Sequence, residues 1–237
     1  MNFTAKERER FDFAVIARWT PPGERVLDLG CGDGKLLRYL RETKSVIGYG
    51  VEIDHERVLG CIRNDVDVIQ LDIEGGLSGF EDHSFDHVII SQALQAMHAT
   101  ERILGEMLRV ADEAVVSFPN FAHWRIRLAL LWGGRMPVTR LLPVAWYETP
   151  NIHHVTVSDF RDLVRDKGIC VEAVWYLSGD KPTSDAAATW RAARSQPCTV
   201  SSTAASMLSC AGAGPRTGRR RWPRRRSGSP PRPSWGC

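Results

Sequence analysis

The sequence has no long hydrophobic run and no apolar segment near its start. Its longest apolar stretches, such as residues 128–132, are far shorter than the roughly 20 residues that a membrane-spanning helix needs. Residues 1–10 are rich in charged side chains, unlike the apolar core of a signal peptide. These two absences argue against a membrane protein and against a secreted one.

Cysteine pairs of the C-x-x-C type are also missing. Two of the six cysteines, Cys31 and Cys61, fall in a predicted loop and a predicted helix. This pattern fits free thiols in a reducing cytoplasm better than a disulfide-stapled scaffold. The adjacent His153 and His154 would point to opposite faces of a strand, and no acid lies at a matching spacing, so we expect no metal site.

Acidic residues are nearly missing from the C-terminal part. Residues 181–237 contain 11 Lys and Arg and one acid, Asp185, so their net charge is +10. The whole chain has 31 basic and 28 acidic residues, so residues 1–180 have 20 basic and 27 acidic residues and a net charge of −7. Apolar residues make up 43% of the 237, enough for one core of ordinary size. We therefore expect one globular domain over residues 1–180 and a separate basic segment, rich in Pro, Arg and Ser, over residues 181–237.

The basic segment has three interpretations. Its composition is what an alternative reading frame of a GC-rich gene produces, so we favour a frame shift in the coding sequence. A solvated, disordered tail is the second interpretation, because such a composition buries little apolar surface. The cluster of Arg around Trp222 is also typical of nucleic-acid binding, which we expect least.

A glycine-rich string at residues 26–34, V-L-D-L-G-C-G-D-G, is the most informative feature that is present. A short apolar run ends at Asp28, and Gly30, Gly32 and Gly34 then alternate before a run of helix formers. Glycines permit a positive φ and a close approach of a ligand to the backbone, and the following helix start offers free N–H groups. An acid ahead of the first glycine would repel a phosphate, so the string suits a cationic ligand better than a dinucleotide.

The string resembles the first motif of class I S-adenosylmethionine-binding proteins, whose ligand carries an ammonium and a sulfonium. The resemblance implies S-adenosylmethionine, or its product S-adenosylhomocysteine, as the cofactor, with Asp28, Gly30 and Gly32 in its site. Glu52 ends the next predicted strand, 24 positions after Asp28, where a carboxylate can accept the ribose hydroxyls. A solvated residue at the entry of the following helix is the alternative for Glu52.

Two more strand ends carry polar residues of the same kind. In S-adenosylmethionine-binding proteins, an acid after the third strand accepts a hydrogen bond from the adenine amine, and the backbone N–H of the next residue donates a hydrogen bond to the adenine ring. Asp72 and Ile73 occupy these two positions. Asp72 by itself would be a turn residue. Ser91 and Gln92 follow the fourth strand and should flank the methionine portion. Successive parallel strands end in one crevice, so the glycine loop, Glu52 and Asp72 should border a single cavity.

Four strings resemble a more specific family, the MetW proteins of methionine biosynthesis. They are residues 91–97, 115–127, 133–139 and 146–154. The resemblance extends over about residues 12–180 and implies a protein with a methyltransferase fold that supports a homoserine O-acyltransferase of the MetX type. A methyltransferase acting on a small molecule is the alternative, because methyl transfer needs little beyond the alignment of acceptor and sulfonium.

The sequence lacks the Asn/Asp-Pro-Pro-Tyr/Phe string with which many methyltransferases hold a planar amide or base. Residues 91–94, S-Q-A-L, stand in its place, which argues against methylation of a base or an amide. Polar side chains that could surround the mouth of the pocket are Gln92, Gln95, His98, Asn120 and His123. A histidine among them could act as a general base, because its reference pKa is near neutrality.

The pattern of apolar residues predicts a doubly wound, Rossmann-like α/β domain with a mostly parallel sheet and helices on both faces. We expect strands at residues 26–29, 46–51, 67–71, 86–90, 114–118 and 170–176, and helices near residues 5–19, 34–43, 54–64, 100–110 and 158–167. Asp54 and Ser158 are the predicted N-caps of two helices. No convincing seventh strand follows, although the full fold of this class has one beside the fifth.

Residues 121–151 are more apolar than an insertion after the fifth strand needs to be. They include Trp124, Trp132, Trp146 and Tyr147, with arginines among them. One interpretation is a lid that buries these side chains over the cofactor cleft. The other is a surface for a partner protein, since Trp, Tyr and Arg dominate interface hot spots.

Overall fold

A computed structural model of the protein describes residues 11–139, 144–178, 181–182 and 187–193. All of them belong to the first of two compact units, Met1–Cys198. The start of the predicted N-terminal helix and most of the basic segment lie outside the described residues.

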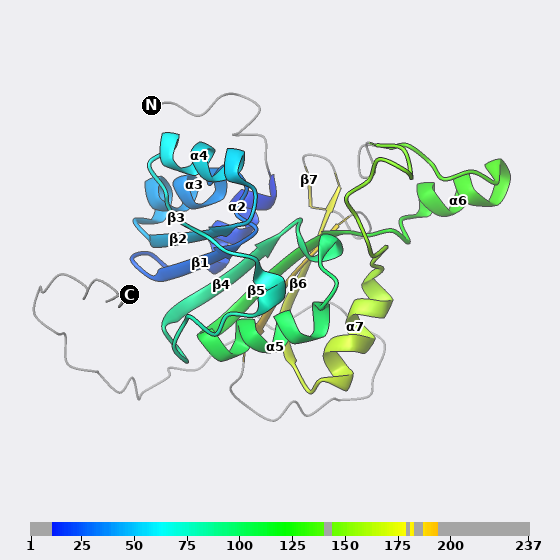
Figure 1. Cartoon of the computed structure of the whole chain (residues 1–237). Coiled ribbons are helices and arrows are strands. Elements are labelled where there is room, and N and C mark those ends of the chain that lie inside the picture. The colour runs from blue at the N-terminus through cyan, green and yellow to red at the C-terminus, as the bar shows by residue number, and fades with distance from the viewer. Residues whose placement is uncertain (1–10, 140–143, 179–180, 183–186, 194–237) are drawn as a thin grey trace, which may run out of the picture. The chain divides into compact units, whose positions relative to one another are not determined.

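A sheet of eight strands, in the order β3-β2-β1-β4-β5-β8-β6-β7, forms the centre of this unit (Figure 1). The strands are β1 (Arg25–Leu29), β2 (Ile47–Glu52), β3 (Asp67–Gln70), β4 (Phe85–Ser91), β5 (Ala111–Pro119), β6 (Cys170–Ser178), β7 (Lys181–Pro182) and β8 (Ala187–Ala193). Strands β1 to β5 pair in parallel, whereas β8 is antiparallel to both of its neighbours. The six strands predicted from the sequence are present, each within three residues of its predicted ends.

Helices cover both faces of the sheet (Figure 1). They are α2 (Phe11–Trp19), α3 (Lys35–Lys44), α4 (His55–Arg63), α5 (Thr100–Val110), α6 (Trp124–Gly133) and α7 (Val157–Asp166), with the short 3-10 helices η1 (Ile73–Gly75) and η2 (Leu94–Ala96). Helices α2, α3 and α4 pack on one face, and α5 and α7 on the other. This arrangement confirms the doubly wound α/β fold; α6 was not predicted.

The central strands are buried on both faces, which explains their continuous apolar sequences. In β4, Val88 and Ile90 belong to the hydrophobic core beside α5 and α7, and Ile89 between them belongs to the core beside α2, α3 and α4. All three side chains are fully buried. The two cores fix the parallel strands in register, so that the carboxyl ends of β1 to β5 lie along one edge of the sheet.

The expectation that no seventh strand follows is wrong. Strand β8 lies between β5 and β6 and pairs with both. Its sequence, A-A-T-W-R-A-A, has few β-branched or aromatic residues, so it gives a weak strand signal, and pairing on both edges stabilises it instead. The sheet therefore continues past the domain boundary at residue 180 that the sequence predicted.

Two further findings concern the helices and the cysteines of the described residues. No helix in the described parts of the chain is long and apolar enough to cross a membrane. Cys31 and Cys61 are free thiols, but Cys170 in β6 is disulfide-bonded, so the expectation of free thiols is wrong at that residue.

The N-caps of two helices test the local predictions. Asp54 caps α4 as predicted, because its carboxylate accepts the backbone N–H of Arg57 at 2.9 Å. At α7 the cap is Thr156, whose hydroxyl accepts the backbone N–H of Asp159 at 3.1 Å. The prediction of Ser158 is wrong because the helix begins earlier than its apolar pattern suggests.

We predict that Thr156→Ala lowers the free energy of unfolding by about 1 kcal/mol, the usual cost of losing an N-cap side chain. Ser158→Ala is the matched control in the first turn of the same helix. It should change the free energy by less than about 0.5 kcal/mol, because Ser158 is exposed. Urea unfolding measures both variants, and equal losses would contradict the assignment of the cap.

Candidate functional site

The loop between β1 and α3 has a backbone that glycines adopt most readily. Gly30, Gly32 and Gly34 have φ angles of 70°, 60° and 75°, in the left-handed region. A Cβ at Gly30 would lie 3.0 Å from the Cβ of Ala93, so this position also requires a small residue. A Cβ at Gly32 would meet nothing within 4 Å, so the loop leaves open space at this point.

The side chain of Glu52, at the end of β2, is buried beside this loop and is 5% exposed. Its carboxylate accepts the backbone N–H of Gly32 at 2.9 Å. It also accepts the N–H groups of Ile53 and Asp54, at 2.9 and 3.1 Å, while Arg57 Nη1 lies 3.9 Å away. A buried carboxylate needs such partners because the loss of its hydration is costly. Glu52 thus connects the glycine loop to the start of α4.

The end of β4 has an unusual backbone. Gln92 has a φ of 59°, a conformation that costs free energy in a residue other than glycine. Its N–H donates to the carbonyl of Ser117, and its carbonyl accepts the Nε2 of Gln95 at 2.8 Å. The carbonyl of Gln95 accepts the N–H groups of Ile152 and His153, at 2.8 and 2.9 Å. These bonds attach the segment before α7 to the end of β4.

Two buried thiols also contact the glycine loop. The Sγ atoms of Cys31 and Cys61 are 3.6 Å apart, and the Cys61 thiol donates to the carbonyl of Gly32 at 3.1 Å. The hydrogen bond with Cys61, burial and the negative charge of Asp28 raise the pKa of the Cys31 thiol. Since the thiolate is the reactive form, this shift disfavours reaction at the Cys31 thiol.

A cavity of about 330 Å³ opens along the glycine loop and the ends of β1 and β4. Its wall includes five of the eight residues predicted to bind a cofactor: Asp28, Gly30, Gly32, Ser91 and Gln92. The volume lies within the range of small-molecule sites, about 300–1,000 Å³. The open space at Gly32 allows a ligand to lie directly against the loop backbone, so these residues fit the implied cofactor.

The sequence predicts that Glu52 and Asp72 border the same cavity as the glycine loop. Neither of them, nor Ile73, is among the described residues that line it. Glu52 instead turns onto backbone N–H groups of the loop and of α4. Asp72 accepts the N–H of Glu74 at 2.9 Å and caps η1, which is the contact of a turn residue.

The other polar candidates have different surroundings. Gln92 lines the cavity, whereas His98 lines a separate one of about 650 Å³ between the starts of α5 and α7. Asn120 accepts two backbone N–H groups and is structural. His123 is a buried residue at the N-cap position of α6. In the described part of the chain, no group of three His, Cys, Asp or Glu could hold a metal ion.

Ten residues on the cavity wall were not among the predicted cofactor residues; those outside the glycine-rich string include Phe13 in α2, Arg57 in α4, and Pro150 and Asn151 before α7. Phe13 is one apolar residue of a helix and carries no chemical signal. Pro150 and Asn151 lie in one of the strings that resemble the MetW family, which is the signal that could have identified them.

Several solved structures with a similar fold are S-adenosylmethionine-dependent methyltransferases. One from Mesorhizobium loti has a TM-score of 0.60 and 18% identity, and the match covers 79% of this chain and all of that one. Magnesium protoporphyrin IX methyltransferase from Synechocystis, solved with bound SAH, has a TM-score of 0.59 and 19% identity, with 82% and 89% covered. At these identities the likeness shows the fold alone.

A curated relative is closer in sequence. The bifunctional methionine biosynthesis protein MetXA/MetW of Rhodopirellula baltica is 37% identical over 170 residues, 68% of this chain and 27% of that protein. This chain therefore spans about a quarter of the relative's length. The family described as methionine biosynthesis protein MetW matches residues 10–201. The chain therefore belongs to the MetW family, and its described domain has the fold of the S-adenosylmethionine-dependent methyltransferases.

Proposed function

We propose that the cavity along the glycine loop binds S-adenosylmethionine or S-adenosylhomocysteine. Three observations support the proposal: the open space at Gly32, the size of the cavity, and the fold shared with methyltransferases. When bound, S-adenosylmethionine supplies a methyl group activated by a sulfonium. The residues of this chain bind and orient the ligand.

Each residue on the wall has a distinct role in this proposal. Asp28 is 2% exposed and provides negative charge near the cationic methionine portion, where a low local dielectric strengthens the attraction. Gly30 and Gly32 let the ligand approach the backbone. Ser91 and Gln92, at the end of β4, flank the methionine portion and fix its position.

Direct contacts of Glu52, Asp72 and Ile73 with the cofactor remain predictions from the family resemblance. The Glu52 carboxylate has about four acceptor positions, and three backbone N–H groups occupy positions on it. One position is left for a ribose hydroxyl. The main contribution of Glu52 in this proposal is to hold Gly32 in place.

We predict that Gly32→Ala weakens the binding of S-adenosylhomocysteine by about tenfold or more. A methyl group forced into a filled site costs about 1–3 kcal/mol, and 1.4 kcal/mol is tenfold in affinity. Gly23→Ala is the matched control: Gly23 also has a positive φ, 79°, and open space around a Cβ, but it does not line the cavity. Calorimetry should give the control an unchanged affinity, and both variants a similar loss of stability from backbone strain. Equal affinities for the two variants would remove the loop from the site.

We also propose that the protein supports a homoserine O-acyltransferase of the MetX type. The observation that carries this proposal is the Rhodopirellula baltica relative, whose name joins MetXA and MetW in one chain. Joining two domains keeps them at a high effective concentration, which benefits domains that work together. Membership of the MetW family supports a role in methionine biosynthesis. A cytoplasmic location stays a prediction.

A methyltransferase acting on a small molecule is the second candidate function. The solved structures that share the fold are methyltransferases, which favours it. The cavity of about 650 Å³, lined by Leu94 at η2 and by His98, offers space for a second ligand. A histidine at such a cavity is suited to removing a proton from an acceptor.

We predict that the full chain, added in equimolar amount, raises the rate of acyl transfer to homoserine by the acyltransferase from the same genome. Serum albumin at the same concentration is the control for unspecific stabilisation. A parallel assay with methyl-labelled S-adenosylmethionine and metabolite extract measures methyl transfer. Labelled methyl in a small product, together with an unchanged acyltransferase, would reverse the order of the two candidates.

A further inference from the structure

The chain between β5 and α7 contains a segment with many exposed apolar side chains. We call residues 124–139 and 144–147 the arm. Helix α6 forms its first part and lies away from the sheet (Figure 1). Within α6 only Ile126 is buried. Trp124, Leu131 and Trp132 are 53%, 75% and 77% exposed.

The second part of the arm also exposes aromatic side chains. Trp146 and Tyr147 are 70% and 71% exposed, and their rings contact each other edge to face at 5.7 Å. The four exposed aromatic side chains of the arm together offer on the order of 500 Å². That is as large as the largest apolar patch of a typical monomer, about 300–600 Å², which is often functional. Single exposed apolar residues are common, but a segment built of them is not.

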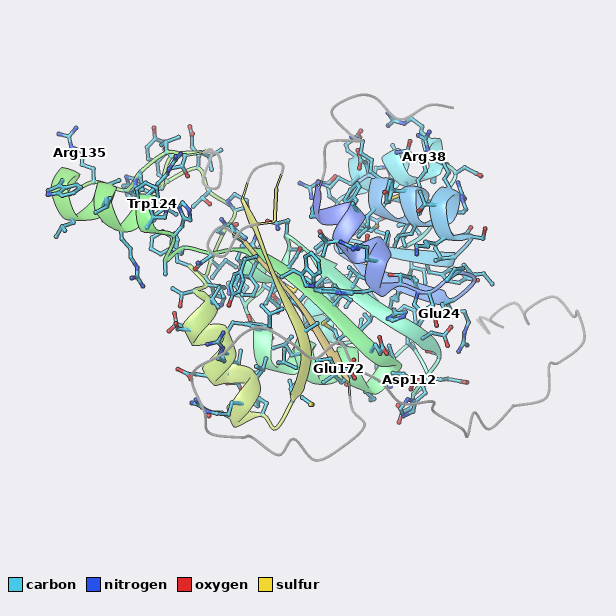
Figure 2. The ribbon with its side chains drawn as sticks, turned by 180° about the vertical axis from the view of Figure 1, so that it is seen from behind. Glu24, Arg38, Asp112, Trp124, Arg135 and Glu172 are labelled. Atoms are coloured by element: carbon cyan, nitrogen blue, oxygen red, sulfur yellow. The ribbon has the colours of Figure 1, made fainter. Side chains whose placement is uncertain are left out.

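Helix α6 has no polar face that would suit it to water. Its sequence, W-R-I-R-L-A-L-L-W-G, is apolar on nearly every side, a pattern typical of a helix that is covered. The polar exceptions, Arg125 and Arg127, are cations, and Arg125 lies over the ring of Trp124 at 5.2 Å. Arg135 follows beyond the end of the helix (Figure 2). A partner that covers α6 must therefore accept positive charge as well as apolar surface.

The charge of the arm differs from that of the rest of the domain. Residues 121–147 contain four arginines and no acid, whereas residues 1–180 as a whole carry a charge of −7. An apolar surface with acidic side chains at its rim would complement the arm. Trp, Tyr and Arg are also the residues that most often carry binding energy at protein interfaces.

The lid interpretation accounts for a different part of the insertion. Pro150 and Asn151 line the cofactor cavity, and Ile152 and His153 donate to Gln95. No residue of the arm lines the cavity along the glycine loop or the cavity of about 650 Å³. The insertion therefore has a portion that closes the cavity and a portion, the arm, that leaves its aromatic side chains in solvent.

We propose that the arm is the docking surface for the acyltransferase. This inference rests on the proposed function. The arm binds a surface of the acyltransferase that is apolar at its centre and has acidic side chains at its rim. The relative that joins MetXA and MetW in one chain supports this occupant. The cationic, aromatic composition of the arm specifies the chemistry of the partner's surface.

The test uses the full chain with Trp132→Ser, and Ile62→Ser as the matched control. Both side chains are exposed, 77% and 61%, but Ile62 lies on α4, outside the arm. We expect Trp132→Ser to weaken binding to the acyltransferase about 30-fold, equivalent to about 2 kcal/mol at a hot spot, and to leave the affinity for S-adenosylhomocysteine unchanged. Ile62→Ser should change neither affinity. Calorimetry measures both ligands on each variant.

A charge variant tests the acidic rim. Arg127→Glu should weaken binding to the acyltransferase, and Arg63→Glu on α4 should have no effect. Binding of the unchanged protein should also weaken as salt is added, because screening reduces attraction between opposite charges.

The possible outcomes distinguish a failure of the proposed docking surface from a failure of the proposed partner. If the unchanged protein binds the acyltransferase and Trp132→Ser binds it equally well, the docking surface is refuted while the proposed function stands. If the unchanged protein does not bind the acyltransferase, the partner and the surface both fall. If Trp132→Ser converts a dimer of this chain into a monomer and leaves acyltransferase binding intact, a second copy covers the arm and the proposal is overturned.

Discussion

The buried carboxylate of Glu52 is the interaction on which the shape of the cavity along the glycine loop depends. It accepts the N–H of Gly32 from the loop after β1, and the N–H groups of Ile53 and Asp54 at the start of α4. When a buried N–H group loses its hydrogen-bond acceptor, the folded state is destabilised by about 1–3 kcal/mol. A buried carboxylate without hydrogen-bond donors destabilises the folded state by more than this. The carboxylate and the three N–H groups therefore stabilise one another. Gly32 is held in the conformation that leaves open space for a ligand.

The proposed sites for the cofactor and for the partner use different parts of one insertion after β5. The carbonyl of Gln95 holds the segment before α7, which brings Pro150 and Asn151 to the wall of the cavity. The arm lines neither the cavity along the glycine loop nor the cavity of about 650 Å³, and it exposes aromatic and cationic side chains. A ligand and a partner can therefore be lost separately by mutation, although one short stretch of chain connects their sites.

Local signals made the central strands and the Asp54 cap predictable, because apolar runs and capping residues act over a few positions. Strand β8 was missed because its stability comes from pairing with β5 and β6, which lie far away in sequence. Five of the residues predicted to bind a cofactor line one cavity because they lie at strand ends that a doubly wound sheet brings together. The inward turn of Glu52 onto Gly32 could not be predicted, since a contact across 20 residues is set by tertiary packing.

Amide hydrogen exchange of Gly32 in the ligand-free protein tests most directly whether Glu52 holds the loop. A hydrogen bond to a charged group contributes about 1.5–3 kcal/mol, and 1.4 kcal/mol is tenfold. The account predicts that Glu52→Ala accelerates this exchange by about tenfold or more, while Glu56→Ala, an exposed acid in the first turn of α4, leaves it unchanged. Equal exchange of the Gly32 amide in the unchanged protein and in Glu52→Ala would contradict it.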